Sequence, residues 1–236
     1  MNEVLNPTCT SCKELNKLFC GLSLPDREGF SQNKRKNVYR KGQVIYYEGN
    51  YPQGLFCIYH GKIKISTIGR KGKEQIVKFK GHGEVLGYRA LLNDEPYNAT
   101  ATAISDCEVC HISKNTFLDT LEKSKHLSLN TIRLLSNDLK ESEQKLINLS
   151  QKPVKERVAE ALLLLKNHFG LEEDGKTIEA KLTRREIGEI AGITTETTIR
   201  ILSDLSKEKI LSLVDKKISI IDIPQLVKIG NNNSTF

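Results

Sequence analysis

The sequence lacks the features that would place the protein in a membrane or outside the cell. No window approaches the ~20 consecutive apolar residues of a membrane-spanning helix. The opening stretch, MNEVLNPTCTSC, has no apolar signal core. These absences predict a cytoplasmic protein with no membrane partner. In a reducing cytoplasm its 6 cysteines are expected to be thiols, metal ligands or redox groups rather than structural disulfides.

The signals of common enzymes are also scarce. The chain has no glycine-rich phosphate-binding fingerprint, no clear pair of nucleophile and base, and only 5 histidines. We therefore expect no enzyme, although a redox or electron-transfer protein that uses the cysteines is an alternative. The net charge of +7 over 236 residues favours an anionic partner such as nucleic acid, without being specific for one.

Residues 37–112 are rich in β-branched and aromatic residues and are interrupted by turn signals at regular intervals. This pattern predicts an antiparallel sandwich or barrel. Within KIKIS, the alternation places Ile63 and Ile65 on one buried face. The turn signals are Lys41-Gly42, Glu48-Gly49, His60-Gly61, Lys71-Gly72 and Gly81-His82-Gly83.

From about Thr116 the pattern becomes helical, and it includes a narrow apolar stripe on a polar helix. The stripe has alternating spacings of three and four, which is typical of a two-helix coiled coil between subunits. A helix packed on its own sheet is the alternative, but it usually shows a wider stripe. The stripe consists of Ile132, Leu135, Leu139, Ser142, Leu146 and Leu149.

The next helix is expected to carry Pro153 in its first turn and to close at Gly170 in a left-handed conformation. After it, LTRREIGEIAGITTETTIRILSDLSKEKIL predicts two helices joined by a tight turn. A capping box of Thr183 and Glu186 starts the first helix. Gly188 permits close crossing, Gly192 supplies a positive φ, and Thr194 caps the second helix. The inward positions are Ile187, Ala191, Ile193, Thr198, Ile201 and Leu205.

Four residues then share the outward face of the second helix: Thr195, Glu196, Ile199 and Arg200. Arginine can donate two hydrogen bonds to guanine, glutamate can accept one from cytosine, and an exposed isoleucine can contact a thymine methyl. An ordinary surface ion pair between Glu196 and Arg200 is the alternative. The hairpin expected in ILSLVDKKISIID, turning at Asp215-Lys216-Lys217, forms a wing whose lysines can contact phosphate.

With this order of elements, the chain resembles the CRP/FNR family of bacterial transcription regulators over nearly its whole length. The segments GEVLGYRALLNDEPYNATATA and TTETTIRILSDLSKEKIL carry the resemblance. It implies an α+β fold with three parts: an N-terminal β-roll like the cyclic-nucleotide-binding jelly roll (1–123), a long dimerisation helix (124–150) and a C-terminal winged helix-turn-helix (151–236). It also implies a homodimer on a two-fold DNA operator, which meets RNA polymerase if it activates.

The resemblance also carries over to single residues. Glu196 and Arg200 fall where the family places its base-reading residues. We also expect Thr194, at the start of that helix, to be among the DNA-binding residues. Thr195 stands where the cAMP receptor type has a further Arg, and Ile199 where the FNR type has a Ser. The half-site should therefore be related to the family's without being identical.

Residues 83–103 resemble the effector-pocket segment of the family, but this effector segment departs from the cyclic-nucleotide pattern. Gly83 and Glu84 match the ribose-contacting part, but Tyr97 and Asn98 stand where cyclic-nucleotide binders have Arg and Ser or Thr. A buried phosphate without a charged partner is costly, so the sequence disfavours a cyclic nucleotide. Arg89 lies nearby and could substitute for the missing charge, which keeps a cyclic-nucleotide-responsive regulator as an alternative.

FNR-type sensors resemble this chain in having an N-terminal cysteine cluster and one cysteine in the roll, which bind an iron–sulfur cluster. The resemblance implies Cys9, Cys12, Cys20 and Cys110 as ligands. The gap from Cys12 to Cys20 is longer than in the oxygen sensor, and Cys107 is another candidate for the fourth ligand. Zinc, a redox disulfide or inert thiols remain alternatives. Cys57, in the apolar run LFCIY, is expected in the core.

Overall fold

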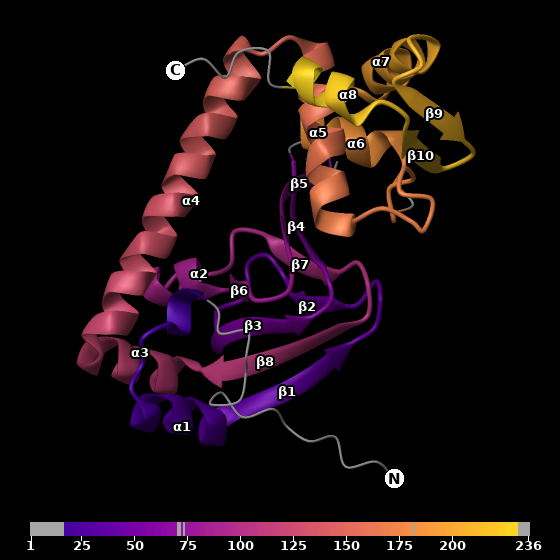
Figure 1. Cartoon of the computed structure of the whole chain (residues 1–236). Helices are drawn as coiled ribbons and strands as arrows, with labels where there is room; N and C mark the ends of the chain where they lie inside the picture. Colours follow the sequence, from indigo (N-terminus) through magenta and orange to yellow (C-terminus); the bar gives the residue numbers. More distant parts are fainter. Residues whose placement is uncertain (1–16, 70–71, 73, 181, 231–236) are drawn as a thin grey trace. The chain divides into compact units, whose positions relative to one another are not determined.

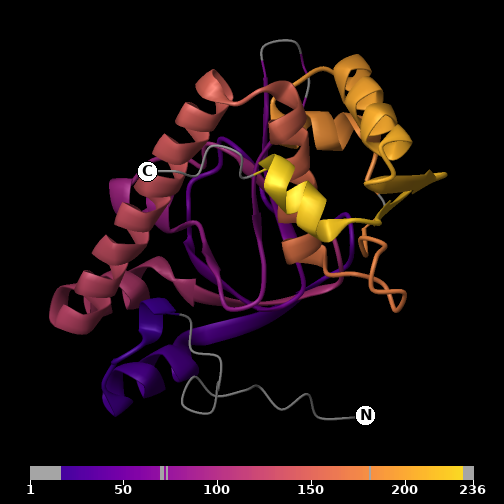
Figure 2. The same ribbon diagram turned by 45° about the horizontal axis from the view of Figure 1, so that its top comes forward.

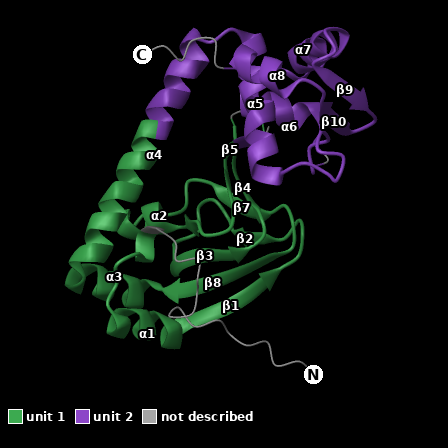
Figure 3. Cartoon of the chain, in the orientation of Figure 1, with its two compact units in different colours: residues 1–73, 77–140 green, residues 74–76, 141–236 purple. Residues whose placement is uncertain are grey.

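The computed structural model of the chain describes residues 17–69, 72, 74–180 and 182–230. The chain divides into two compact units, residues 1–73 with 77–140 and residues 74–76 with 141–236 (Figure 3). The long helix α4 (Lys125–Gln151) contributes residues to both units. Among the described residues, none of the helices combines the length and the apolar character that crossing a membrane requires.

The β-roll consists of two four-stranded sheets (Figure 1). One sheet has the order β1-β8-β3-β6 and the other β2-β7-β4-β5. Strand β8 pairs antiparallel with β1 and β3, and β7 pairs antiparallel with β2 and β4, which confirms the predicted antiparallel sandwich. The strands are β1 Lys34–Tyr39, β2 Val44–Tyr46, β3 Gly54–His60, β4 Ile63–Ile68, β5 Glu74–Lys80, β6 Val85–Leu86, β7 Thr100–Ala103 and β8 Cys107–Ser113.

The turn at His60-Gly61 shows why the sequence interrupts its strands with glycine. Gly61 has a φ of 97°, which L side chains rarely adopt. A Cβ at this position would also lie 2.5 Å from the Cys107 sulfur and 2.5 Å from the Asp106 carbonyl oxygen. Glycine therefore allows the β3–β4 turn to close against the start of β8.

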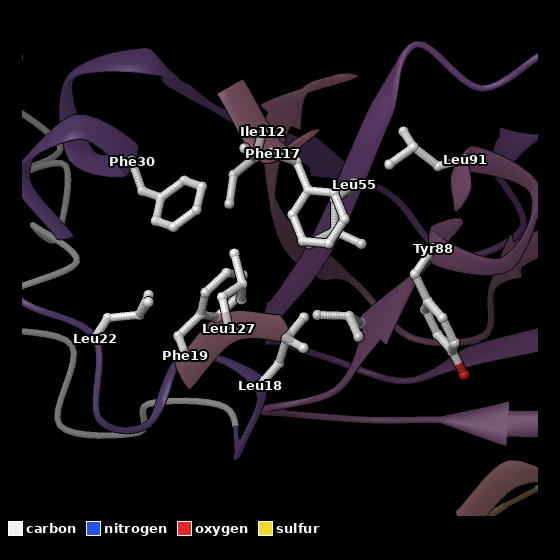
Figure 4. Close-up of a cluster of buried hydrophobic side chains, with 11 residues drawn as sticks. Leu18, Phe19, Leu22, Phe30, Leu55, Tyr88, Leu91, Ile112, Phe117 and Leu127 are labelled. Atoms are coloured by element: carbon white, nitrogen blue, oxygen red, sulfur yellow. The ribbon is translucent and has the colours of Figure 1, made fainter. Parts of the chain in front are cut away.

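Among the described residues of this unit, buried side chains gather in an inner and an outer cluster. The inner cluster lies within the roll and contains Ile63, with Ile65 packed against it as predicted. The outer cluster (Figure 4) joins the roll to the surrounding helices η1 Lys17–Phe19, α1 Leu24–Asn33, α2 Tyr88–Asn93, α3 Lys114–Lys123 and α4. Its buried members are Leu18, Phe19, Leu22, Phe30, Leu55, Val85, Tyr88, Leu91, Ile112, Phe117 and Leu127.

Besides the end of α4 and residues 74–76, the described part of the second unit forms three core helices, a hairpin and a final helix. Helix α8 (yellow) lies against α5 in Figures 1 and 2. The elements are α5 Val154–Phe169, α6 Arg184–Ala191, α7 Thr195–Lys207, β9 Leu211–Val214, β10 Lys217–Ile220 and α8 Ile223–Gly230. The fully buried side chains at its centre include Leu162, Leu165, Ile187, Leu202, Leu205, Ile220 and Leu226.

Both expectations for the ends of α5 need correction. Pro153 is the N-cap, one position before the first turn, because its ψ of 150° is extended rather than helical. Gly170 closes the helix with a φ of 78°, but its ψ of −170° lies outside the left-handed helical region. That combination is essentially restricted to glycine, so the choice of residue was foreseen but its conformation was wrong.

Candidate nucleic-acid interface and sensor region

The start of α6 is held by the capping box predicted from the sequence. The Thr183 hydroxyl accepts a hydrogen bond from the Glu186 backbone N–H at 3.2 Å, and the Glu186 carboxylate accepts one from the Thr183 N–H at 2.8 Å. Two backbone donors that a helix start leaves unsatisfied are thus both paired. This fixes where α6 begins relative to the turn that follows it.

The turn between α6 and α7 depends on two glycines and a cap. A Cβ on Gly188 would lie 2.6 Å from the Thr198 hydroxyl, so α7 crosses α6 at a distance that only glycine permits. Gly192 has φ 66° and ψ 42°, the left-handed conformation that ends α6. Thr194 caps α7 by accepting a hydrogen bond from the Thr197 N–H at 3.2 Å. These observations confirm the predicted helix-turn-helix geometry.

Most of the positions predicted to face inward are buried. Ile187, Ala191, Thr198, Ile201 and Leu205 are buried, whereas Ile193 is half-buried. The prediction omitted Leu202, which is fully buried on the same side of α7. Its position one residue after Ile201 widens the apolar stripe, which is typical of a helix that packs in a domain core.

Three of the four residues expected on the outward face of α7 are exposed. These are Glu196, Ile199 and Arg200, and the Ile199 side chain is 52% exposed. Thr195, in the first turn, is half-buried. An exposed branched apolar residue between a carboxylate and a guanidinium gives this face the mixed chemistry that reads base edges in a major groove.

The hairpin after α7 forms as predicted, but its turn is shorter. Strands β9 and β10 pair antiparallel, with Val214 opposite Lys217, so Asp215 and Lys216 alone make the turn. Lys217 belongs to β10, and its ammonium donates to Glu172 at 2.8 Å. That hydrogen bond raises the pKa of Lys217. Lys216 is therefore better placed than Lys217 to meet phosphate.

Two further arginines, not among the predicted site residues, lie at the start of the helix-turn-helix. Arg184 and Arg185 occupy the first turn of α6, directly after the Thr183 cap. Arg184 is half-buried, and burial lowers the pKa of its guanidinium. Arg185 is exposed and donates to Glu189 at 2.8 Å. The sequence could have revealed these two arginines, because a helix N-terminus that carries basic residues is suited to bind an anion.

In the roll, Tyr97 lies in the inner cluster rather than beside a ligand space. Its ring stacks on Tyr46, with 3.8 Å between ring centroids and 19° between the planes, and Tyr46 in turn lies 5.8 Å from Phe56. Burial raises the pKa of Tyr97 to about 12. At the position where cyclic-nucleotide binders of the family have an arginine, this chain therefore places an aromatic side chain packed into the core.

The other residues expected to contact an effector are either exposed or already bonded within the protein. Arg89 and Asn98 are exposed on the surface. The Glu84 carboxylate is already engaged, because it accepts hydrogen bonds from the Lys80 ammonium and from the Gly81 N–H, both at 2.8 Å. Gly83 forms part of that turn, with its N–H donating to the Ile58 carbonyl.

Alternation along β8 separates the two candidate cysteines of the roll. Cys107 belongs to the inner cluster, and its thiol donates to the Lys62 carbonyl at 3.3 Å. Cys110 is two residues from Ile112, a member of the outer cluster, so it lies on the opposite face of the sheet. Cys57 packs against that outer cluster, as expected for a core residue. Burial raises the pKa of the Cys107 thiol, which disfavours the thiolate that a metal requires.

The segment that carries Cys20 is attached to the outer cluster and to α4. Cys20 itself is exposed, while its neighbours Leu18 and Phe19 are buried. The Asn130 side-chain amide donates to the carbonyl oxygens of Cys20 at 2.8 Å and Leu18 at 3.2 Å. Cys20 and Cys110 are thus both associated with the outer layer of the roll. Cys9 and Cys12 lie outside the described residues.

The apolar stripe of α4 lies on the surface of the chain. Leu127 and Thr131 are buried, so α4 also packs on the roll, but it does so through a different face. A row of large apolar side chains on an otherwise polar helix is typical of a protein–protein contact. Ile132, Leu135, Leu139, Leu146 and Leu149 are between 37% and 68% exposed.

Comparisons with known proteins agree with this arrangement. Residues 36–124 match the family model of the cyclic nucleotide-binding domain, and residues 156–229 match that of the Crp-like helix-turn-helix domain. The chain is 32% identical over 198 residues to the fumarate and nitrate reduction regulatory protein of Vibrio cholerae, covering 84% of this chain and 79% of that one. It is 30% identical over 203 residues to the anaerobic regulatory protein of Pasteurella multocida, covering 86% and 74%.

Solved structures show the same fold. A transcriptional regulator of the CRP/FNR family from Thermus thermophilus superposes with a TM-score of 0.73 at 22% identity, covering 84% of this chain and 98% of that one. FixK2 from Bradyrhizobium japonicum superposes with a TM-score of 0.69 at 24% identity, covering 83% and 96%.

The fold and the site define a DNA-binding transcription regulator rather than an enzyme, built from a β-roll and a winged helix-turn-helix. The chain belongs to the CRP/FNR family, and its curated relatives place it in the FNR-like subgroup.

Proposed function

We propose that this regulator binds two-fold symmetric DNA as a homodimer and reads base edges with Glu196, Ile199 and Arg200 of α7. The single observation that carries the proposal is the exposed outward face of α7, positioned by two caps and two glycines. Arg200 has the reach to donate two hydrogen bonds to a guanine, and Glu196 can accept from a cytosine. Thr194 and Thr195 lie at the helix start, where backbone N–H groups favour a phosphate.

The test compares Arg200→Ala with Lys216→Ala in the wing. Arg200→Ala should weaken binding to the preferred operator by about 1–3 kcal/mol and relax the choice of one base pair. Lys216→Ala should weaken binding to all duplexes alike and reduce the salt slope by about one. Titrations of selected and scrambled duplexes at several salt concentrations measure both effects. An equal loss for Arg200→Ala on both duplexes would make Arg200 a phosphate contact and contradict base reading.

The same proposal assigns dimerisation to the exposed stripe of α4. We take residues 1–123 as the sensor part, 124–150 as the dimerisation helix and 151–236 as the DNA-binding part. Leu139 lies near the middle of the stripe and is exposed, so Leu139→Glu should shift the chain toward monomer with little loss of fold. Sedimentation equilibrium checks this expectation. A chain that is monomeric before substitution would contradict the dimer.

For the signal, we infer a redox- or oxygen-responsive site made by Cys9, Cys12, Cys20 and Cys110. Two features of the described residues support an iron–sulfur cluster: Cys110, although buried, lies on the sheet face that carries the outer cluster, and Cys20 is exposed on a segment packed in the same layer. Four thiolates satisfy such a cluster, which would supply a group that changes with oxidation. The bonds from Asn130 to the Cys20 segment then connect that segment to α4.

The test is anaerobic purification followed by iron and sulfide assay and visible absorbance. Substituting Cys20 or Cys110 by Ser should abolish the absorbance, whereas Cys107→Ser should retain it, because Cys107 faces the roll interior. Zinc without iron would favour a structural metal. A colourless, iron-free protein with full operator affinity would contradict the cluster.

A cyclic nucleotide is disfavoured as the signal, because Tyr97 fills the position of the expected arginine and Glu84 is bonded to Lys80. If the regulator activates transcription, RNA polymerase is its remaining partner. The exposed Tyr51 and the turn at Asp94 are candidate contact points on the roll surface.

A further inference from the structure

Helix α4 carries two stripes that lie side by side along its first half. One faces the roll: Leu127 and Thr131 are buried and Leu134 packs against the outer cluster. The other is the exposed stripe, in which Ile132 and Leu135 each follow a roll-facing residue by one position. Successive residues of an α-helix are about 100° apart around its axis. The rotation of α4 about its own axis that packs the roll-facing stripe against the roll therefore also determines the direction in which the exposed stripe points.

Asp138 is the next residue of α4 on the roll-facing side after Leu134. Unlike Leu134, it contacts the roll through hydrogen bonds. Its carboxylate accepts a hydrogen bond from the Lys78 ammonium of β5 at 2.7 Å and another from the Tyr88 hydroxyl of α2. The Asp138 side chain is 19% exposed. In Figure 4 the Tyr88 hydroxyl points away from the labelled apolar side chains of the outer cluster. A single carboxylate thus joins three elements: α4, β5 and α2.

The protonation states suit this arrangement. Burial by itself raises the pKa of Asp138, but the hydrogen bonds from Lys78 and Tyr88 and the charges of Lys78 and Lys80 outweigh it, so the pKa lies below its ordinary value. Burial and the bond to Asp138 raise the pKa of Tyr88, which keeps the proton on its hydroxyl. The carboxylate is therefore charged and the hydroxyl donates. Charge-assisted bonds of this kind are directional and stronger than neutral ones.

We propose that Asp138 is a positioning residue that fixes the rotation of α4 on the roll and thereby sets how Leu135 and Leu139 face a second copy of the chain. Leu139 directly follows Asp138 in α4. A rotation of the helix caused by a change in the bonds of the Asp138 carboxylate therefore also moves Leu139, near the middle of the exposed stripe. Tyr88 begins α2, which lies within residues 83–103, the segment that resembles the effector pocket of the family. A shift of α2 would then reach the dimer contact through the bond between Tyr88 and Asp138. The proposal rests on the homodimer proposed above.

The first experiment measures dimer dissociation and operator affinity in the full chain. Asp138→Asn and Tyr88→Phe should each weaken dimer association and operator affinity by about fivefold or more. Asp138→Asn removes the charge of the acceptor and Tyr88→Phe removes the donated proton, and neither changes the shape of the side chain much. Asp119→Asn, an exposed carboxylate on α3, is the matched control and should change both by less than about twofold. In the double variant the two losses should not add, because both act through one bond.

A second measurement separates positioning from a general loss of stability. Leu139→Cys should form disulfide-linked dimers faster than Asn137→Cys, with the parent chain as background, because Leu139 lies on the stripe and Asn137 does not. When Asp138→Asn is added to each cysteine variant, the rates of disulfide formation of the two variants should become more similar. If both rates fell in proportion, or if Asp138→Asn stayed within about twofold of the parent in both affinities, the positioning role would be overturned.

Failure of the underlying dimer gives a different result. A parent chain that is monomeric, or a Leu139→Cys variant no faster than Asn137→Cys, would overturn the α4 contact itself and the role of Asp138 with it. A dimer that persists unchanged in Asp138→Asn would overturn the role of Asp138 alone.

Discussion

Helix α7 and the effector segment of the roll (residues 83–103) differ in whether the side chains predicted to bind a ligand are exposed or buried. On α7, the residues suited to bind a ligand point outward, and the buried residues on the other side hold the helix in place. In the roll, Tyr97 is itself part of the core, and the charged Arg89 lies on the surface. One unit therefore presents an exposed helix face, whereas the other fills with a buried aromatic ring the position at which the cyclic-nucleotide binders of the family have an arginine.

Under the proposed function, this difference favours a signal site outside the roll interior. A regulator of this fold needs one input that changes the dimer and one output that binds DNA. Aromatic packing surrounds Tyr97 in the roll interior, whereas in the outer layer the Cys20 segment and α2 contact α4 through Asn130 and Asp138. The proposed signal site belongs to this outer layer. Both contacts are on the helix that carries the dimer stripe.

The substitution with the largest expected effect is Tyr97→Ala, which tests whether Tyr97 belongs to the core of the roll. Truncating a large buried aromatic side chain costs about 3–5 kcal/mol, so we expect a loss of this size if Tyr97 is core. Tyr47→Ala, at an exposed tyrosine, should change stability by no more than about 0.5 kcal/mol. Urea unfolding monitored by circular dichroism measures both. A small loss for Tyr97→Ala, together with calorimetric binding of cyclic AMP by the parent chain, would restore the roll as a ligand pocket.

A pair of glycine substitutions compares the close helix crossing in the second unit with an open helix in the first. Gly188→Ala should destabilise by about 1–3 kcal/mol, because the new methyl group would overlap the Thr198 hydroxyl and approach the Ile193 carbonyl oxygen at 3.0 Å. Gly29→Ala, in α1, meets no atom within 4 Å and should stabilise by roughly 0.5–1 kcal/mol. If thermal unfolding showed gains for both variants, α6 and α7 would have to lie farther apart than the structure shows.

The difference between the two units also explains what the sequence could predict. The helix-turn-helix was accessible because its determinants are local: Thr183 bonds with a residue three positions away, and Gly188 meets Thr198 ten positions later. The burial of Tyr97 was not accessible, since it depends on stacking with Tyr46 from a distant strand. Helix α1 escaped notice because it buries only Phe30, although Ser23 caps it. Helix α8 has just eight residues, too few for a convincing period.

Removing a helix cap from each unit should distinguish stability from binding. Thr194 caps α7, and Ser113 caps α3 by accepting a hydrogen bond from the Thr116 N–H at 3.2 Å. Replacing either by Ala should lower the free energy of unfolding by ~1 kcal/mol. Only Thr194→Ala should also weaken operator binding of the folded protein, because it loosens the first turn beside Glu196. Equal operator affinities for the two variants would mean that the start of α7 takes no part in recognition.

The smallest expected effect is a pH dependence that belongs to the roll. His111 on β8 packs beside Phe56, with 4.9 Å between ring centroids. Burial, and then the charge of Arg35, lower the pKa of His111 below its ordinary value. The unfolded chain therefore binds a proton near pH 6.5 while the folded chain still excludes it, so the free energy of unfolding should fall as the pH drops through that value.

Denaturant midpoints at pH 7.5 and 5.5 test this expectation. The parent chain should unfold at a lower denaturant concentration at pH 5.5, and His111→Gln should remove part of the difference. His60→Gln, an exposed position on β3, serves as the control and should leave the difference unchanged. If His111→Gln kept the full pH dependence, the packing around Phe56 would not be what excludes the proton, and the contrast between a closed roll and an open α7 would rest on Tyr97 and its ring stack alone.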